Sequence, residues 1–243
     1  IKNLVLPFSD KNVGGVGGHL LFGLDVGSPI SQSQGAYWQQ ELRLRQCESL
    51  LGILAVSSGP ILAVRRKIFP TMVETVGEDC LIPLEVVSKG YTMKHQATAL
   101  AYDRMDNGAR QEFRTRARMT QRNWQGTWMY PDLLNPFKNF GVALALWSHK
   151  VLRWLSPFFL ITWVISSFAV VIQSSMQYIM PIALAASYCG LFFCILATLG
   201  FIFHLMGKKM LLGSSVWTFC LANLGFFVGV LKGLLGQKIK AYR

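Results

Sequence analysis

The sequence has few acidic residues and lacks the short motifs by which many soluble enzymes bind nucleotides or metals. It holds 12 Asp and Glu residues against 24 Lys and Arg residues, a net charge of +12. Its five cysteines form no CxxC pair, and they match no metal-ligand spacing with the four histidines. The glycine-rich run at 12–22 has neither the Gly-Lys-Ser/Thr ending of a phosphate loop nor the GxGxxG spacing. We therefore expect reduced, structural cysteines in a cytoplasm-facing protein, and glycines that serve close backbone packing.

The basic excess lies beside long apolar segments. Hydrophobic residues make up 52% of the chain, and from about Leu155 onward the sequence is mostly apolar. A basic surplus usually indicates nucleic acid, anionic lipid or a phosphorylated substrate as partner. Next to membrane spans, membrane lipids and a nucleotide diphosphate are the expected partners, and nucleic acid is not expected.

The chain begins at Ile1 without an initiator Met or a signal peptide. This start predicts the C-terminal portion of a longer protein. Its 243 residues suffice for one domain of catalytic size plus a membrane bundle.

The first half of the sequence alternates between patterns typical of strands and of helices. Hydrophobic spacing and turn residues predict these elements in order: a strand at 12–22, a helix at 37–51, a strand at 53–64 interrupted at 57–60, a helix at 80–88 that Gly90 ends, and a strand at 91–101. This alternation indicates an α/β domain.

A helix predicted at 110–124 carries a stripe of arginines on one face. The stripe recurs every four residues: Arg110, Arg114, Arg118 and Arg122. Only Glu112 lies nearby as an acidic partner. Contact with an anion and plain solvation both remain open for this face.

A segment at 137–154 mixes tryptophans with basic residues, which suits a helix lying in the membrane interface. On this interpretation His149 is an interfacial residue rather than a ligand. Three apolar spans follow, at 155–173, 179–204 and 213–231, each near the length that a bilayer crossing requires.

The charges of the linkers predict the orientation of these spans. The first linker, 174–177, is uncharged, whereas the second carries Lys208 and Lys209, so the α/β domain and the second linker are expected in the cytoplasm. Three crossings would, however, place the basic tail outside, with Lys238, Lys240 and Arg243. Three crossings are the main expectation, and a re-entrant or interfacial third segment is the alternative.

A set of short motifs runs in order through almost the whole chain: Gly59, Arg65-Arg66, Gly77-Glu78-Asp79, Gly90-Tyr91, Gln121-Arg122-Asn123-Trp124 and Ser148–Trp154. This ordered set resembles membrane-bound family 2 glycosyltransferases, which are related to cellulose, chitin, hyaluronan and poly-N-acetylglucosamine synthases. No single motif is decisive, but the order is fairly specific.

The resemblance implies a partial α/β domain of the GT-A type at 1–133, an interfacial amphipathic helix at 134–154, and an all-α transmembrane bundle of about three helices at 155–243. It also implies an inverting hexosyltransferase in the cell membrane, with a cytoplasmic catalytic domain, that makes exopolysaccharide or envelope glycan from a nucleotide-diphosphate sugar. In this family Mg²⁺ or Mn²⁺ is bound by a DxD motif, which this sequence lacks, so we expect the cofactor site upstream and no metal ligand in the chain.

Matched to the family, Asp79 is the general base for the acceptor hydroxyl and Glu78 is its supporting neighbour. Adjacent acids raise each other's pKa, which favours a base that works near neutrality. The structural alternative is that both simply begin a helix, where negative charge is favourable. Ser57, Ser58 and Gly59 match the loop that shapes the acceptor site.

The chain departs from the family at its Gln-x-x-Arg-Trp signature. Gln121, Arg122 and Trp124 are present but differently spaced, so Arg122 or Arg118 is expected to reach the diphosphate. Trp124 either stacks on an acceptor ring or packs in a core. The departure puts processivity in doubt and makes a single-sugar transferase plausible, with a glycan or a lipid-linked acceptor. The alternative from another class is a non-catalytic, synthase-like membrane scaffold subunit.

Overall fold

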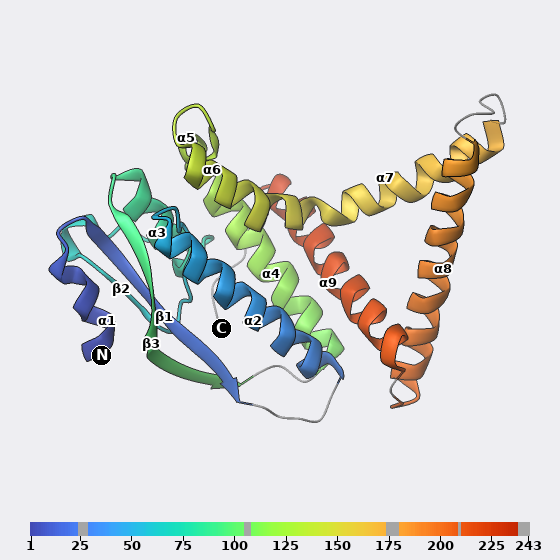
Figure 1. Cartoon of the computed structure of the whole chain (residues 1–243), viewed down its shortest axis with the longest axis horizontal. Helices are drawn as coiled ribbons and strands as arrows, with labels where there is room; N and C mark the ends of the chain where they lie inside the picture. Colours follow the sequence, from blue (N-terminus) through green and yellow to red (C-terminus); the bar gives the residue numbers. More distant parts are fainter. Residues whose placement is uncertain (24–28, 105–107, 174–179, 209, 238–243) are drawn as a thin grey trace.

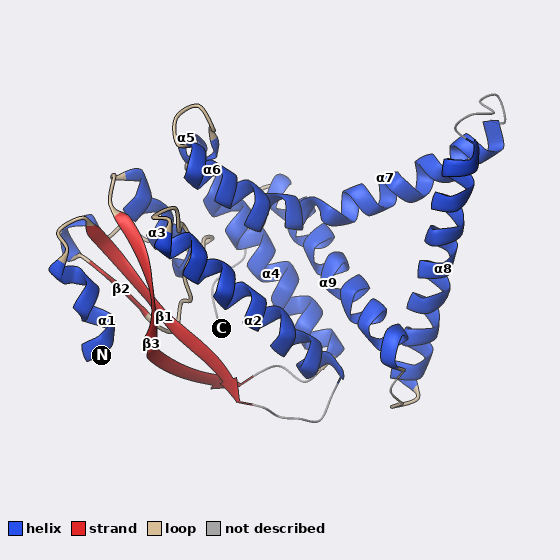
Figure 2. Cartoon of the chain, in the orientation of Figure 1, coloured by secondary structure: helices blue, strands red, loops and turns tan. Residues whose placement is uncertain are grey.

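The computed structural model describes residues 1–23, 29–104, 108–173, 180–208 and 210–237. Figures 1 and 2 show a small sheet with helices beside it, followed by long helices that extend away from it. An α/β part followed by apolar helices, as the sequence predicts, is confirmed at this level of detail.

The sheet of the described residues is mixed, in the order β2-β1-β3. The central strand β1 (Val13–Gly23) pairs antiparallel with β2 (Leu62–Val64) and parallel with β3 (Thr92–Arg104). The strands expected at 12–22 and 91–101 are therefore confirmed. A parallel pair needs a crossover connection, and here the chain between β1 and β3 supplies it.

The glycines of β1 allow close packing, as the sequence indicates. A Cβ atom at Gly14 would lie 2.6 Å from side-chain atoms of Ile68 and Tyr91, and one at Gly17 would meet Ser57 Oγ. Neighbouring side chains thus rest directly on the strand backbone.

The strand expected at 53–64 is wrong for most of its length, because only Leu62–Val64 forms a strand. Residues 53–61 form a loop that leaves the sheet, and the backbone N–H of Ser57 donates to the carbonyl of Asp79 at 3.3 Å. Pro60 cannot donate a strand hydrogen bond, and the small residues before it permit the turn away. The loop therefore reaches the start of the next helix.

Two helices lie along the sheet. Helix α2 (Pro29–Leu50) contacts β3, and α3 (Glu78–Ser88) contacts β1 and β3. Helix α3 begins two residues earlier than expected, so Glu78 and Asp79 form its first turn. It ends as predicted near Gly90, whose φ of +78° favours glycine.

The arginine-rich helix α4 (Ala109–Trp128) extends beyond the predicted 110–124 and contacts α3 on one side and α9 (Leu211–Leu234) on another. Short elements complete the domain: α1 (Lys2–Val5), η1 (Leu6–Ser9), η2 (Arg66–Ile68) and α5 (Pro131–Leu134).

The segment expected to be a separate interfacial helix is continuous with the first span. Helix α6 (Phe140–Leu146), the π turn η3 (Trp147–Val151) and α7 (Leu152–Gln173) follow one another without a break. Around the π turn, His149, Val151 and Trp154 are buried. The junction thus packs into the α/β part instead of lying free at a surface.

Three helices in the described residues are long and apolar enough to cross a membrane, in the regions Phe140–Val170, Pro181–Leu205 and Leu212–Leu234. The last two correspond to α8 (Met180–Leu205) and α9. The chain is therefore a membrane protein. The uncharged linker 174–177, Lys209 and the basic residues Lys238, Lys240 and Arg243 lie outside the described residues, whereas Lys208 is exposed.

The main hydrophobic core joins the α/β part to the long helices. Cys80 and Leu84 of α3 pack with Trp124 of α4, Trp154 of α7 and Phe226 of α9 in one buried cluster. Helix α9 is therefore part of the core that supports the start of α3.

Candidate functional site

A cavity of about 480 Å³ opens where the 53–61 loop, the start of α3, α4 and the α6–α7 junction meet. Seven of the nine site residues predicted from the sequence line it: Ser57, Ser58, Gly59, Glu78, Asp79, Arg118 and Arg122. Residues that are up to 65 positions apart in sequence thus surround one space. A cavity of this size can hold a small-molecule ligand.

The two acids differ in exposure although they are adjacent in the first turn of α3. Glu78 is exposed and Asp79 is partly buried. Gly59 faces Glu78 closely, since a Cβ atom at Gly59 would lie 3.0 Å from Glu78 Oε1. Both carboxyl groups lie at a helix N-terminus, where the backbone dipole favours negative charge.

The electrostatic environment of Asp79 suits a proton acceptor. Burial raises the pKa of its carboxyl, the Glu78 carboxylate raises it further, and the cations of Lys150, Arg45 and Arg122 oppose the rise. The net result is a pKa above the ordinary value of 3.8. A carboxylate whose pKa lies closer to neutrality is a stronger base.

Arg118 and Arg122 reach the cavity from α4. Arg122 Nη2 donates to the carbonyl of Val76 at 2.7 Å, and its buried Nε has no hydrogen-bond partner among the described residues. The carbonyl contact holds the guanidinium near the acids, and the Nε–H remains available for an anionic ligand.

Ser57 and Ser58 are both buried in the cavity wall but have different surroundings. Ser58 Oγ accepts a hydrogen bond from Arg45 Nη1 at 2.5 Å, whereas Ser57 Oγ has no partner among the described residues. An unpaired buried hydroxyl is costly to a fold, which is a reason to expect a ligand contact there.

This difference predicts opposite results for two matched substitutions. Ser58→Ala leaves an Arg45 donor unpaired and is expected to cost about 1–3 kcal/mol of stability. Ser57→Ala removes an unpaired hydroxyl, so stability should be unchanged or higher while KM for the ligand rises. Thermal unfolding in detergent and steady-state kinetics measure both. Equal losses of stability in the two variants would contradict the assignment.

Gln121 and Trp124 are the two predicted site residues that do not line the cavity. Gln121 is buried, and its Nε2 donates to the carbonyl of Gln237 at 2.6 Å. Trp124 is 7% exposed and lies in the core, with its ring centroid 5.6 Å from that of Trp128 and 6.2 Å from that of Trp154. The structure thus places Trp124 in core packing, against Trp128 of its own helix and Trp154 of α7.

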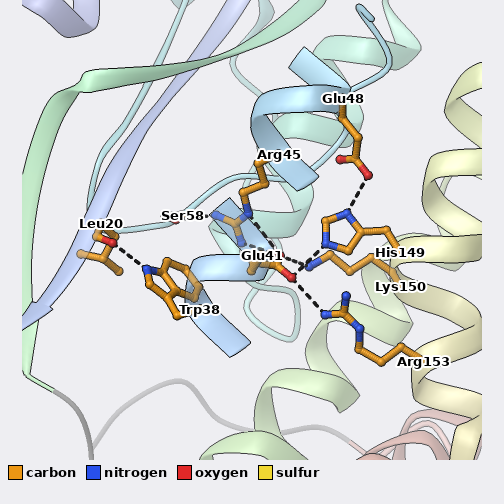
Figure 3. Close-up of polar contacts among 9 residues, drawn as sticks. All are labelled: Leu20, Trp38, Glu41, Arg45, Glu48, Ser58, His149, Lys150 and Arg153. Atoms are coloured by element: carbon orange, nitrogen blue, oxygen red, sulfur yellow. Dashed lines mark hydrogen bonds and ion pairs between the residues drawn. The ribbon is translucent and has the colours of Figure 1, made fainter. Parts of the chain in front are cut away.

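A buried ionic cluster beside the cavity was missed from the sequence (Figure 3). At its centre is Glu41 of α2, which accepts from Arg45 Nη2, Lys150 Nζ and Arg153 Nη1, each at 3.0 Å, and is paired with His149 Nε2 at 2.9 Å. His149 Nδ1 pairs with Glu48 at 2.7 Å. The interfacial assignment of His149 is therefore wrong: it is 4% exposed and clamped between two carboxylates.

The cluster has more positive than negative groups. Burial acts to raise the pKa of Glu41, but Lys150, His149 and Arg45 outweigh it and hold the pKa well below its usual range. Glu41 is thus ionised. The two carboxylates of the cluster, on Glu41 and Glu48, face three cations even when His149 is not counted. All three cations, Arg45, Lys150 and Arg153, also line the cavity.

The sequence contains a partial signal for this cluster. Glu41, Arg45 and Glu48 follow one another at spacings of four and three, which places them on one helix face. His149 and Arg153 are likewise four residues apart. A charged face of this kind normally faces solvent, and nothing local shows that these two faces are buried against each other.

No model of a known protein family matches the chain, and no curated protein matches it. The site must therefore be interpreted from its own geometry. Among the described residues no three His, Cys, Asp or Glu side chains are grouped so that they could hold a metal ion.

The arrangement combines a carboxylate of raised pKa with a group of fixed cations in one cavity. The carboxylate can take a proton from a weak nucleophile such as a hydroxyl, and the cations can stabilise an anion. Together these are the requirements for moving a group from an anionic leaving group to an alcohol.

Proposed function

We propose that the protein is an inverting, membrane-integrated glycosyltransferase, of hexosyltransferase type, whose residues 1–133 belong to a GT-A-like catalytic domain. The observation that carries the proposal is the cavity in which Asp79 faces Arg45, Arg122 and Lys150. The donor is a nucleotide-diphosphate sugar, and the acceptor is a glycan or a lipid-linked sugar of exopolysaccharide or envelope synthesis.

In the proposed reaction Asp79 accepts the proton of the acceptor hydroxyl as its oxygen attacks the anomeric carbon. The bond from that carbon to the diphosphate oxygen breaks, and its electron pair leaves with the nucleoside diphosphate. Attack opposite the leaving group inverts the anomeric centre. Glu78 keeps the pKa of Asp79 raised, and Arg118 and Arg122 stabilise the diphosphate.

The remaining predicted residues have supporting roles. Ser57 and Gly59 shape the acceptor side of the cavity, and Ser58 holds Arg45 in place. Gln121 and Trp124, which are themselves on α4, fix this helix to Gln237 and to the hydrophobic core. A divalent cation, Mg²⁺ or Mn²⁺, would neutralise the donor diphosphate when bound by a DxD motif upstream of this chain. The domain would face the cytoplasm.

The alternative is a non-catalytic scaffold subunit related to such synthases. This sequence contains no DxD motif, so the scaffold stays the alternative. The two functions differ in a single measurable property, which is transfer of sugar.

The test uses membranes that contain the protein expressed from its complete gene. They are incubated with a panel of radiolabelled UDP- and GDP-sugars, and labelled product is compared with membranes lacking the protein. Incorporation that depends on the protein supports the transferase. Absence of incorporation from every donor, with the protein present and folded, would favour the scaffold.

A further inference from the structure

Helix α9 packs along α4 through a row of glycines. Gly225 lies against Arg116, Gly229 against Thr120 and Gly233 against Trp124, and a Cβ atom at each glycine would come within 3.0 Å of its neighbour. Both rows advance by four residues, so the two helices run side by side in the same direction, as Figure 1 shows.

The end of α9 is also tied to the α/β part. The carbonyl of Gln237 accepts from Gln121 Nε2 at 2.6 Å and from Gln125 Nε2 at 3.2 Å. Near the middle of α9, Asn223 Oδ1 accepts from Ser156 Oγ at 2.5 Å. The segment from Asn223 to Gln237 is thus held against α4 and the start of α7.

Helix α4 cannot lie in the hydrocarbon of a bilayer. It carries five arginines: Arg110, Arg114, Arg116, Arg118 and Arg122. Each arginine at the centre of a bilayer costs about 2.5–3.5 kcal/mol even on the mildest scale. The half of α9 that lies beside α4 must therefore be at the same depth as α4, outside the hydrocarbon core.

The other half of α9 is too short to cross alone. From Leu211 to Leu224 it has about 14 residues and a length of about 21 Å, whereas the hydrocarbon core is about 30 Å thick. Length and composition make α9 a candidate span, but the part of α9 that is not docked on α4 is too short to cross the hydrocarbon core.

We propose that α9 lies in the membrane interface on top of α4 and that, of the three long helices, only α7 and α8 cross the bilayer. In Figure 1, α7 extends away from the α/β part and α8 runs back from the far end of α7. Helix α9 then runs from the end of α8 along α4, so that the three helices outline a triangle with α9 as its base. Where α8 meets α9, the rings of Phe201 and Trp217 lie 4.7 Å apart.

The partner of this surface is the lipid at the boundary between headgroups and acyl chains. The outward side of α9 exposes large apolar residues along its whole length: Leu212, Phe219, Leu224, Leu231, Leu234 and Leu235. Lys232 is exposed in the last turn, where it can reach headgroups. One face of α9 is thus docked on the protein, and an apolar face is open to the lipid.

This arrangement also agrees with the distribution of positive charge. With two crossings, Lys208 and Lys232 are on the same side as the arginines of α4, as the positive-inside rule requires.

The first test measures the depth of spin labels in lipid nanodiscs. Leu212→Cys, Leu224→Cys and Leu234→Cys are made one at a time on a background without the native cysteines. All three should lie at one shallow depth, about 5–10 Å below the headgroup level. The matched controls on α8, Ile182→Cys, Phe192→Cys and Ile202→Cys, should be deepest at the middle position. The proposal fails if Leu224→Cys is as deep as Phe192→Cys.

The second test leaves the native cysteines in place. An epitope tag is added after Arg243, and sealed membrane vesicles of both orientations are treated with trypsin. The tag should be lost in the same vesicles in which the α/β part is digested. Protection of the tag in those vesicles would overturn the proposal.

Discussion

Asp79→Asn is expected to lower the rate of sugar transfer by about 100-fold to 10,000-fold, because asparagine cannot accept the proton of the acceptor hydroxyl. The substitution changes the shape of the side chain very little. Binding of the donor should therefore persist, and the loss should appear in kcat. Transfer assays with membranes that contain equal amounts of each protein measure the effect.

The same substitution should not destabilise the fold. A carboxyl group whose pKa is raised in the folded state weakens folding at pH values above its ordinary pKa, because the folded protein holds the proton more tightly than the unfolded chain. Asparagine removes this penalty. Thermal unfolding at pH 7 should give an unchanged or higher midpoint for Asp79→Asn, while activity is lost.

The pH dependence of the natural protein should agree with this assignment. Transfer requires the ionised carboxylate, so kcat/KM should fall as the pH drops through the raised pKa of Asp79. Because the Glu78 carboxylate raises the pKa of Asp79, Glu78→Gln should shift this fall in kcat/KM to lower pH.

Asp132→Asn is the matched control for Asp79→Asn. Asp132 lies in an exposed ion pair with Lys138, outside the cavity, and its loss should leave transfer and stability nearly unchanged. Transfer by Asp79→Asn at the natural rate would remove Asp79 from the mechanism. Equal loss in both variants would point to a general effect of the assay.

The parts of the fold that the sequence predicts correctly are those with local signals. Each of these signals can be recognised from residues that are neighbours in the sequence. They are the glycines of β1, the positive φ at Gly90 and the length of the apolar segments. Local chemistry is sufficient in these cases. The loop with Ser57 and the acids of α3 are instead matched to one site through the family resemblance.

The parts that were not predicted depend on which distant elements meet. Glu41 and His149 are 108 residues apart, and each looks like an ordinary surface residue in its own helix. The four-residue spacing of Gly225, Gly229 and Gly233 is visible in the sequence, but the spacing does not reveal that α4 is its partner. The strand expected at 53–64 is wrong for most of its length because residues 57–60 turn the chain away from the sheet, toward the carbonyl of Asp79.

Glu41→Gln is expected to destabilise the protein by about 3–5 kcal/mol, the usual cost of removing one partner from a buried ionic cluster. The glutamine oxygen can still accept a hydrogen bond, but the charge that balances Arg45, Lys150 and Arg153 is lost. Cations that line the cavity would then repel one another without a neutralising centre. Unfolding in detergent, with Glu74→Gln as the control at an exposed position, measures the difference.

The dependence on pH identifies the origin of this loss. The folded-state pKa of Glu41 lies below its ordinary value of 4.5, so its stabilisation is complete above about pH 4.5 and is lost as the pH falls through the lowered value. The difference in the free energy of unfolding between the natural protein and Glu41→Gln should thus be constant near neutrality and become smaller only in strong acid. If this difference is absent at pH 7, or does not become smaller in acid, Glu41 does not hold the cations by charge. Transfer by a refolded Glu41→Gln should show a raised KM for the donor, since Lys150 and Arg153 would no longer be held at the cavity wall.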